Sequence, residues 1–128
     1  MTQQLREPSR KEMSADEFLS RSAPKTETMS VPEVGGDIVI RAITLEEREK
    51  ITSGAKVLSS GVIDDSAFLA LTLIHGMVTP RLEPKHIAGL KVSCWGVVDK
   101  IARRIWEISG VKYDKDGKAK AEEAAKNV

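Results

Sequence analysis

Residues 26–41 contain two short runs whose residue types favour β-strands. In 26–31 (TETMSV) threonine and valine alternate with polar neighbours, and 38–40 (IVI) is a β-branched run. Gly35-Gly36 lies between the two runs and can adopt the positive φ that a tight hairpin turn requires. The pattern therefore predicts a β-hairpin. Because Pro32 has no N–H group to donate, we expect its strand to be an edge of the sheet.

Helical periodicity predicts two helices directly after the hairpin. Thr44 and Glu47 form a capping box at the start of a helix that should run to about residue 60, where Gly61 ends it. The buried positions of that helix should be Ile51, Ala55 and Leu58. Residues 67–75 (AFLALTLIH) are apolar on nearly every side, which is typical of a central core helix. One of three polar residues should cap this helix: Asp64, Asp65 or Ser66.

Two later helices and one early helix complete the pattern. Residues 78–82 (VTPRL) should cross the surface, and Pro84 suits the first turn of a short helix. Ser93 is positioned to cap a long final helix. The buried stripe of that helix should be Val98, Ile101, Ile105 and Ile108. Near the N-terminus, Ser14 and Glu17 make a capping box for a short helix.

These elements predict an α+β fold, with an N-terminal β-hairpin packed on a bundle of about four α-helices, mostly helical. The 128 residues have room for one domain. We expect a flexible N-terminal arm with a short helix over 1–24, a hairpin-plus-helices core domain over 25–110, and a charged, flexible C-terminal tail over 111–128. A single hairpin is marginally stable in water, so it should lie on the helices or on strands of a partner.

The composition narrows the classes of function. Twenty Lys and Arg residues face 19 Asp and Glu residues, giving a net charge of +1, so no overall field attracts nucleic acid or an anionic membrane. The longest apolar run is too short to span a bilayer. The single Cys94 cannot form an internal disulfide, and we expect it to be a reduced, buried thiol in a cytoplasmic protein.

Few residues have the chemistry of a catalytic or metal site. His75, His86 and Cys94 are the only soft ligands, and their spacing fits no zinc pattern. A nucleophile made of Cys94 and His75 would have no carboxylate nearby in the sequence to orient it. The Gly35-Gly36 pair lacks the Lys-Ser/Thr of a phosphate-binding loop. We therefore expect no enzyme, no cofactor and no metal site.

Two classes of binding protein stay open on residue chemistry. Residues 83–109 would form two helices joined by a short turn, as in helix-turn-helix DNA-binding regulators. The second helix carries three cations: Lys100, Arg103 and Arg104. Asp99 and Glu107 counter these cations at helical spacing, which is typical of a solvated face. The other class is a protein-interaction domain with an edge hairpin and apolar helices, although the same apolar faces could simply pack on each other.

The residues of the hairpin and its flanks resemble a known family. The segment 13–49 (MSADEFLSRSAPKTETMSVPEVGGDIVIRAITLEERE) is similar to the start of tail assembly chaperones from long-tailed phages, of siphovirus or myovirus type, and their prophages. Those chains typically have a short acidic helix ending in Phe-Leu, a Lys-Thr strand, a Val-Pro-Glu-apolar-Gly-Gly turn, a β-branched strand with Arg, and Leu/Ile-Thr-x-x-Glu-Arg. The matching positions here are Phe18-Leu19, Lys25-Thr26, 31–36, 38–41 and 43–48. Residues 97–110 (VVDKIARRIWEISG) are also similar, whereas about 53–92 keep only the hydrophobic pattern.

The resemblance implies a non-catalytic protein that acts during virion assembly in the host cell cytoplasm. Such chaperones bind the tape-measure protein, keep it soluble, help recruit tail-tube subunits, and are absent from the mature virion. Many of their genes yield a longer form by programmed frameshift, whose extension recruits the tube protein. The codons of residues 125–127 (AKN) can contain a slippery sequence, at which a ribosome shifts frame. Homo-oligomers are compatible with this role, and no nucleic acid or membrane partner is implied.

The partner-binding residues that this interpretation indicates lie mainly on the hairpin, with one tryptophan added from the last helix. They are Val34, Gly35, Gly36, Ile38, Ile40, Arg41 and Trp106.

Overall fold

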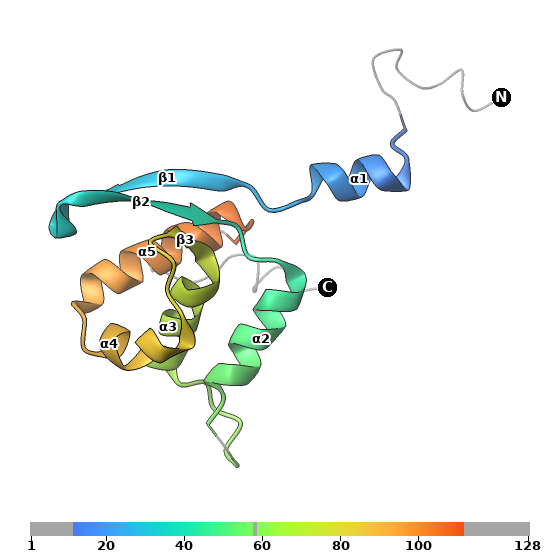
Figure 1. Cartoon of the computed structure of the whole chain (residues 1–128). Coiled ribbons are helices and arrows are strands. Elements are labelled where there is room, and N and C mark those ends of the chain that lie inside the picture. The colour runs from blue at the N-terminus through green and yellow to red at the C-terminus, as the bar shows by residue number, and fades with distance from the viewer. Residues whose placement is uncertain (1–11, 58, 112–128) are drawn as a thin grey trace.

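A computed structural model describes residues 12–57 and 59–111 of the chain (Figure 1). Residues 112–128 of the predicted 111–128 tail, the first 11 residues of the predicted arm, and Leu58 lie outside these ranges. The described elements are, in chain order, α1 (Ala15–Arg21), β1 (Thr26–Val31), the 3₁₀ turn η2 (Pro32–Val34), β2 (Gly36–Arg41), α2 (Leu45–Ala55), α3 (Asp65–Gly76), β3 (Met77–Thr79), the 3₁₀ turn η3 (Pro84–His86), α4 (Ile87–Lys91) and α5 (Trp95–Ile108).

The predicted hairpin forms, and a third strand joins it. β1 and β2 pair antiparallel in the register Thr26↔Arg41 to Val31↔Gly36. The short strand β3 pairs antiparallel with β2, giving the sheet order β1-β2-β3. Val78 and Thr79 lie at the surface as expected, but they form part of strand β3 rather than a simple crossing segment. β1 is an edge as expected, but Pro32 lies in the turn rather than in the strand.

The fold has two layers, with the sheet on one side and the helices on the other (Figure 1). α3 is the central helix, since it packs on α2, α4 and α5. The main core joins the inner face of the sheet to α3 and α5, and its members are Val31, Ile38, Ile40, Leu73, Met77, Val98, Ile101, Ala102 and Ile105. This arrangement confirms the α+β prediction of an N-terminal hairpin on a mostly helical bundle. Within the described ranges, no helix has the length and apolar character needed to cross a membrane.

The start of α2 agrees with the sequence, but its end does not. The Thr44–Glu47 capping box is present. The helix stops at Ala55 instead of about residue 60, because the backbone of residue 64 donates its N–H to the Ala55 carbonyl at 2.7 Å and a tight loop follows. Gly61 adopts φ +73° within that loop rather than ending the helix. At Gly54, a Cβ atom would come within 2.9 Å of the Leu71 side chain, so this glycine permits the close approach of α2 and α3.

The ends of α5 are defined by local contacts. Cys94, not Ser93, is the N-cap, because the Ser93 hydroxyl donates instead to the Gly89 carbonyl at 2.8 Å. At the other end, the N–H groups of Gly110 and Val111 donate to carbonyls of the last turn at 3.0 and 2.9 Å, and Gly110 has φ +101°. This is the Schellman arrangement, in which a residue with positive φ satisfies the last helical carbonyls.

Candidate protein-binding surface

The tip of the hairpin is an exposed turn closed by a backbone hydrogen bond. Gly35 adopts φ +72° and donates its N–H to the Pro32 carbonyl at 3.0 Å. Val34 is 61% exposed at this tip. The neighbouring Glu33 carboxylate accepts from Lys100 of α5 at 3.1 Å, which links the tip to the helix layer. A backbone hydrogen bond lowers the pKa of Glu33, and the hydrogen bond from Lys100 adds to this effect. The turn therefore presents Val34 to solvent at the tip of the hairpin.

Three of the residues predicted to bind a partner lie inside the fold instead. Ile38 and Ile40 are buried between the sheet and the helices. Trp106 is only 7% exposed; its ring stacks on Phe68 with centroids 5.7 Å apart, and its Nε1 donates to the Thr72 hydroxyl at 3.1 Å. These side chains support the surface from beneath. Of the predicted set, only the exposed Val34, Gly35 and Gly36 and the half-buried Arg41 reach the surface.

Arg41 is committed to an internal ion pair. Its Nη1 donates to Glu47 Oε1 at 2.8 Å, and its Nη2 contacts the other carboxylate oxygen. Thr44 donates its N–H to the same carboxylate at 3.0 Å, and His75 Nδ1 lies 3.6 Å away. The hydrogen bonds from the Arg41 guanidinium are the main cause that lowers the pKa of Glu47 to about 2, and hydrogen bonds from Thr44 contribute. The group joins β2, α2 and α3, so Arg41 holds the layers together rather than facing a partner.

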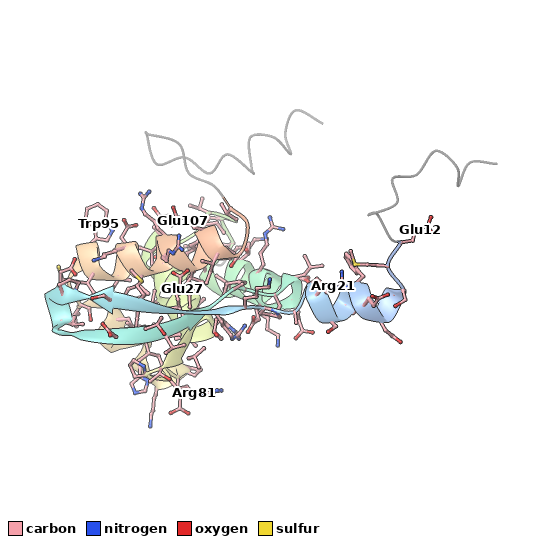
Figure 2. The ribbon with its side chains drawn as sticks, turned by 90° about the horizontal axis from the view of Figure 1, so that it is seen from above. Glu12, Arg21, Glu27, Arg81, Trp95 and Glu107 are labelled. Carbon is pink, nitrogen blue, oxygen red and sulfur yellow. The ribbon has the colours of Figure 1, made fainter. Side chains whose placement is uncertain are left out.

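The cations of α5 also have carboxylate partners within the fold. Arg104 donates from Nε and Nη2 to Glu27 of β1 at 2.6 and 2.7 Å, and this pairing lowers the pKa of Glu27. Figure 2 shows Glu27 beside α5. Arg103 contacts Asp99 at 2.8 Å, and Lys100 contacts Glu33. A DNA interface on this face would have to break these ion pairs.

One exposed apolar pair lies on α1, which projects beyond the end of the sheet (Figures 1 and 2). Phe18 is 57% exposed and Leu19 is 65% exposed, and no residue of α1 is buried against the described part of the chain. The helix is held by its own side chains: Ser14 and Glu17 form the predicted capping box, and Arg21 pairs with Glu17 at 3.3 Å. The resemblance included Phe18-Leu19, but the residue pattern did not place this pair on the surface.

A second apolar surface lies at the corner between α4 and α5. Trp95 is 75% exposed, points away from the ribbon in Figure 2, and has the exposed Val92 nearby in the sequence. Cys94 lies between them and is exposed, so the expectation of a buried thiol is wrong. Its neighbours are apolar in sequence, yet they occupy the outside of a turn between two helices. The exposed tryptophan is thus Trp95, whereas Trp106, which the sequence indicates as partner-binding, is buried.

The two histidines contact different partners. His86 Nδ1 accepts the N–H of Glu83 at 2.9 Å, and His75 lies next to Glu47. Among residues 12–57 and 59–111, no three His, Cys, Asp or Glu side chains are grouped as metal ligands would be. One cavity of about 380 Å³ lies between the linker after α1, the start of α2 and the end of α5. Arg21 and Lys25 are among the residues that line it.

Searches of protein-family models, of curated proteins and of solved structures each found no match. The functional assignment therefore depends on the residues of the chain and on the surfaces described above.

Proposed function

We propose that this chain is a tail assembly chaperone of a long-tailed phage or prophage. In this role it binds the apolar, helical tape-measure protein and keeps it soluble in the host cytoplasm until tail-tube subunits assemble around it. It is not an enzyme, and it is absent from the finished virion. A frameshifted longer form would supply the contact with the tube protein.

The exposed apolar pair of α1 is the observation that carries this proposal. A seven-residue helix is short for an isolated helix in water, and Phe18 and Leu19 make no buried contact with the described fold. An apolar pair on a projecting helix fits a groove or stripe on another helical chain. The sequence segment that resembles the chaperones begins at this helix and continues through the hairpin turn that exposes Val34.

The small size of each contact also suits the role. Two side chains on α1 and one at the hairpin tip would bind weakly, at about 1.5–3 kcal/mol for each fully buried side chain before the costs of association. Many copies along one long client would nevertheless cover its apolar stripe through multivalency. Each copy could then be displaced in turn by the growing tube.

Co-expression with a tape-measure fragment that is insoluble by itself tests the proposal. We expect the wild-type chain to bring the fragment into the soluble fraction. Leu19→Asp should return the fragment to the pellet, because a carboxylate on the exposed apolar pair cannot be buried against the client without a large desolvation penalty. Val62→Asp is the matched control, since Val62 is exposed in the loop between α2 and α3, far from α1 in Figure 1.

The co-expression results distinguish an error in the proposed function from an error in the proposed contact surface. If wild-type chain leaves the fragment insoluble, the chaperone function is wrong. If Leu19→Asp and Val62→Asp both solubilise it as well as wild type, the function stands but α1 is not the contact. Circular dichroism of both variants should match wild type, because neither side chain belongs to the core.

A further inference from the structure

Strand β1 has one side that pairs with no other described strand. The Ala42 N–H donates to the Lys25 carbonyl at 3.0 Å, which identifies Lys25 and Ala42 as a hydrogen-bonded pair in the register of the hairpin. In an antiparallel ladder such pairs alternate along the strand. Every second residue from Lys25 therefore directs its backbone groups to β2. The residues between them direct their N–H and C=O groups outward, and they are Thr26, Thr28 and Ser30.

We propose that a second copy of this chain occupies this edge, with β1 pairing antiparallel to β1 of the partner copy about a twofold axis at Thr28. The outward residues are Thr26, Thr28 and Ser30. When Thr28 of one copy lies opposite Thr28 of the other, the two edges therefore place small hydroxyl residues opposite one another, and threonine has a high β-propensity. Thr26 then lies opposite Ser30. Three hydrogen-bonded pairs give about six backbone hydrogen bonds and one continuous sheet of two copies.

The charges along β1 allow this pairing. Exposed edge strands commonly carry charged side chains that block association, but the outward positions of β1 carry none. Glu27, the one acidic residue of the strand, faces the helix layer, where Arg104 holds it at 2.6 and 2.7 Å. At each end of the paired strands, Lys25 would face the hairpin turn of the other copy, which carries Glu33. No like charges lie opposite each other in this register, because Lys25 lies opposite Val31 and Glu27 opposite Met29.

The same register accounts for the exposed tip of the hairpin. With Thr28 on the twofold axis, Lys25 of one copy lies opposite Val31 of the other, so the segment between α1 and β1 lies next to the turn η2. Val34 in η2 would then lie near the segment between α1 and β1 of the partner copy. The pairing covers part of an apolar side chain that is exposed in the single chain. This inference does not depend on the proposed function.

Sedimentation equilibrium of the full chain tests the dimer. We expect wild-type protein to dimerise reversibly and Thr28→Lys to weaken dimerisation at least about tenfold, because two like charges would face each other across the axis. Thr28→Pro should have the same effect, since it removes an outward N–H that the hairpin itself does not use. Ser53→Lys on the exposed face of α2 is the matched control and should dimerise like wild type.

Chemical cross-linking locates the axis. In a Cys94→Ser background, Thr28→Cys should react with a short bismaleimide to give a covalent dimer, because the two Cα atoms would be about 5.5 Å apart. Ser53→Cys should not. Wild-type chain that stays monomeric at all accessible concentrations, as it would if the edge served a client strand, overturns the proposal. So does a dimer that Thr28→Lys leaves unchanged, or one that cross-links through Ser53→Cys instead.

Discussion

Gly76 is the position where the packing of the helices is most sensitive to one added atom. It is the last residue of α3 and is buried, and a Cβ atom built there would lie 2.7 Å from both Cδ1 and Cγ2 of Ile105. Comfortable carbon–carbon contacts begin near 3.5 Å, so one of the two helices must move by about 0.8 Å. Ile105 is itself fully buried in α5, which leaves its side chain little room to turn away.

We therefore expect Gly76→Ala to destabilise the fold. Overpacking of this kind costs about 1–3 kcal/mol, and the higher helix propensity of alanine offsets at most about 1 kcal/mol. A net loss of about 1–2 kcal/mol corresponds to a fall in Tm of roughly 5–15 °C for a domain of this size. Urea denaturation followed by circular dichroism measures the free energy of unfolding directly.

Gly89→Ala provides the matched control for that measurement. Gly89 lies in α4, and a Cβ built there meets nothing within 4 Å. The same substitution should therefore stabilise the fold there by about 0.4–1 kcal/mol, through the lower entropy of the unfolded chain. If Gly76→Ala proves as stable as wild type or shifts in the same direction as Gly89→Ala, then α3 and α5 do not approach as closely as described, and the argument is refuted.

Three further predictions concern acid stability, the hairpin and the tryptophans. The pKa of Glu47 falls from 4.5 to about 2 on folding, so its ion pair should stabilise the fold above about pH 4.5 and lose this effect as the pH falls towards 2. In Glu47→Gln, the free energy of unfolding measured with urea should therefore depend less on pH over this range, by roughly 3 kcal/mol. Ile40→Asp should precipitate or unfold, whereas Val34→Asp should keep the wild-type circular dichroism and lose affinity for a tape-measure fragment, which pull-down measures. Acrylamide should quench Trp95 strongly and Trp106 weakly, so Trp95→Phe should remove most of the quenchable fluorescence and Trp106→Phe little of it.

The elements that the sequence predicts well are those encoded by local contacts. The capping boxes at Ser14 and Thr44 form as expected, because each involves side chains three residues apart. The hairpin also forms, because its β-branched runs favour strands and Gly35 favours a turn at the same place in the chain. By contrast, β3 has only three residues, too few for a periodic pattern, and it exists because Met77–Thr79 meets β2 in space.

The candidate surface was harder to predict because exposure depends on what lies opposite a side chain. Trp95 precedes Val98 by three residues, so helical spacing places both on one stripe of α5. Val98 meets the core, but Trp95 lies in the first turn of α5, at the α4–α5 corner, where the chain enters from outside. The same reason applies to Cys94, whose apolar sequence neighbours are themselves exposed. Periodicity identifies a face, and only the tertiary fold shows where that face ends.

Helix α1 forms through local contacts that the sequence encodes, whereas its exposure depends on the tertiary fold. Its helical form depends on contacts within residues 14–22, including the Ser14–Glu17 capping box and the Ser22 hydroxyl, which donates to the Phe18 carbonyl at 2.8 Å. These local contacts favour the helical form before a client binds, although seven residues are few for a helix that stands alone in water. A client that packs on Phe18 and Leu19 would have to immobilise fewer backbone dihedrals than one that folds a disordered segment, and that ordering would otherwise cost about 1–2 kcal/mol for each residue. Local capping thus makes a small apolar contact sufficient for weak, reversible binding.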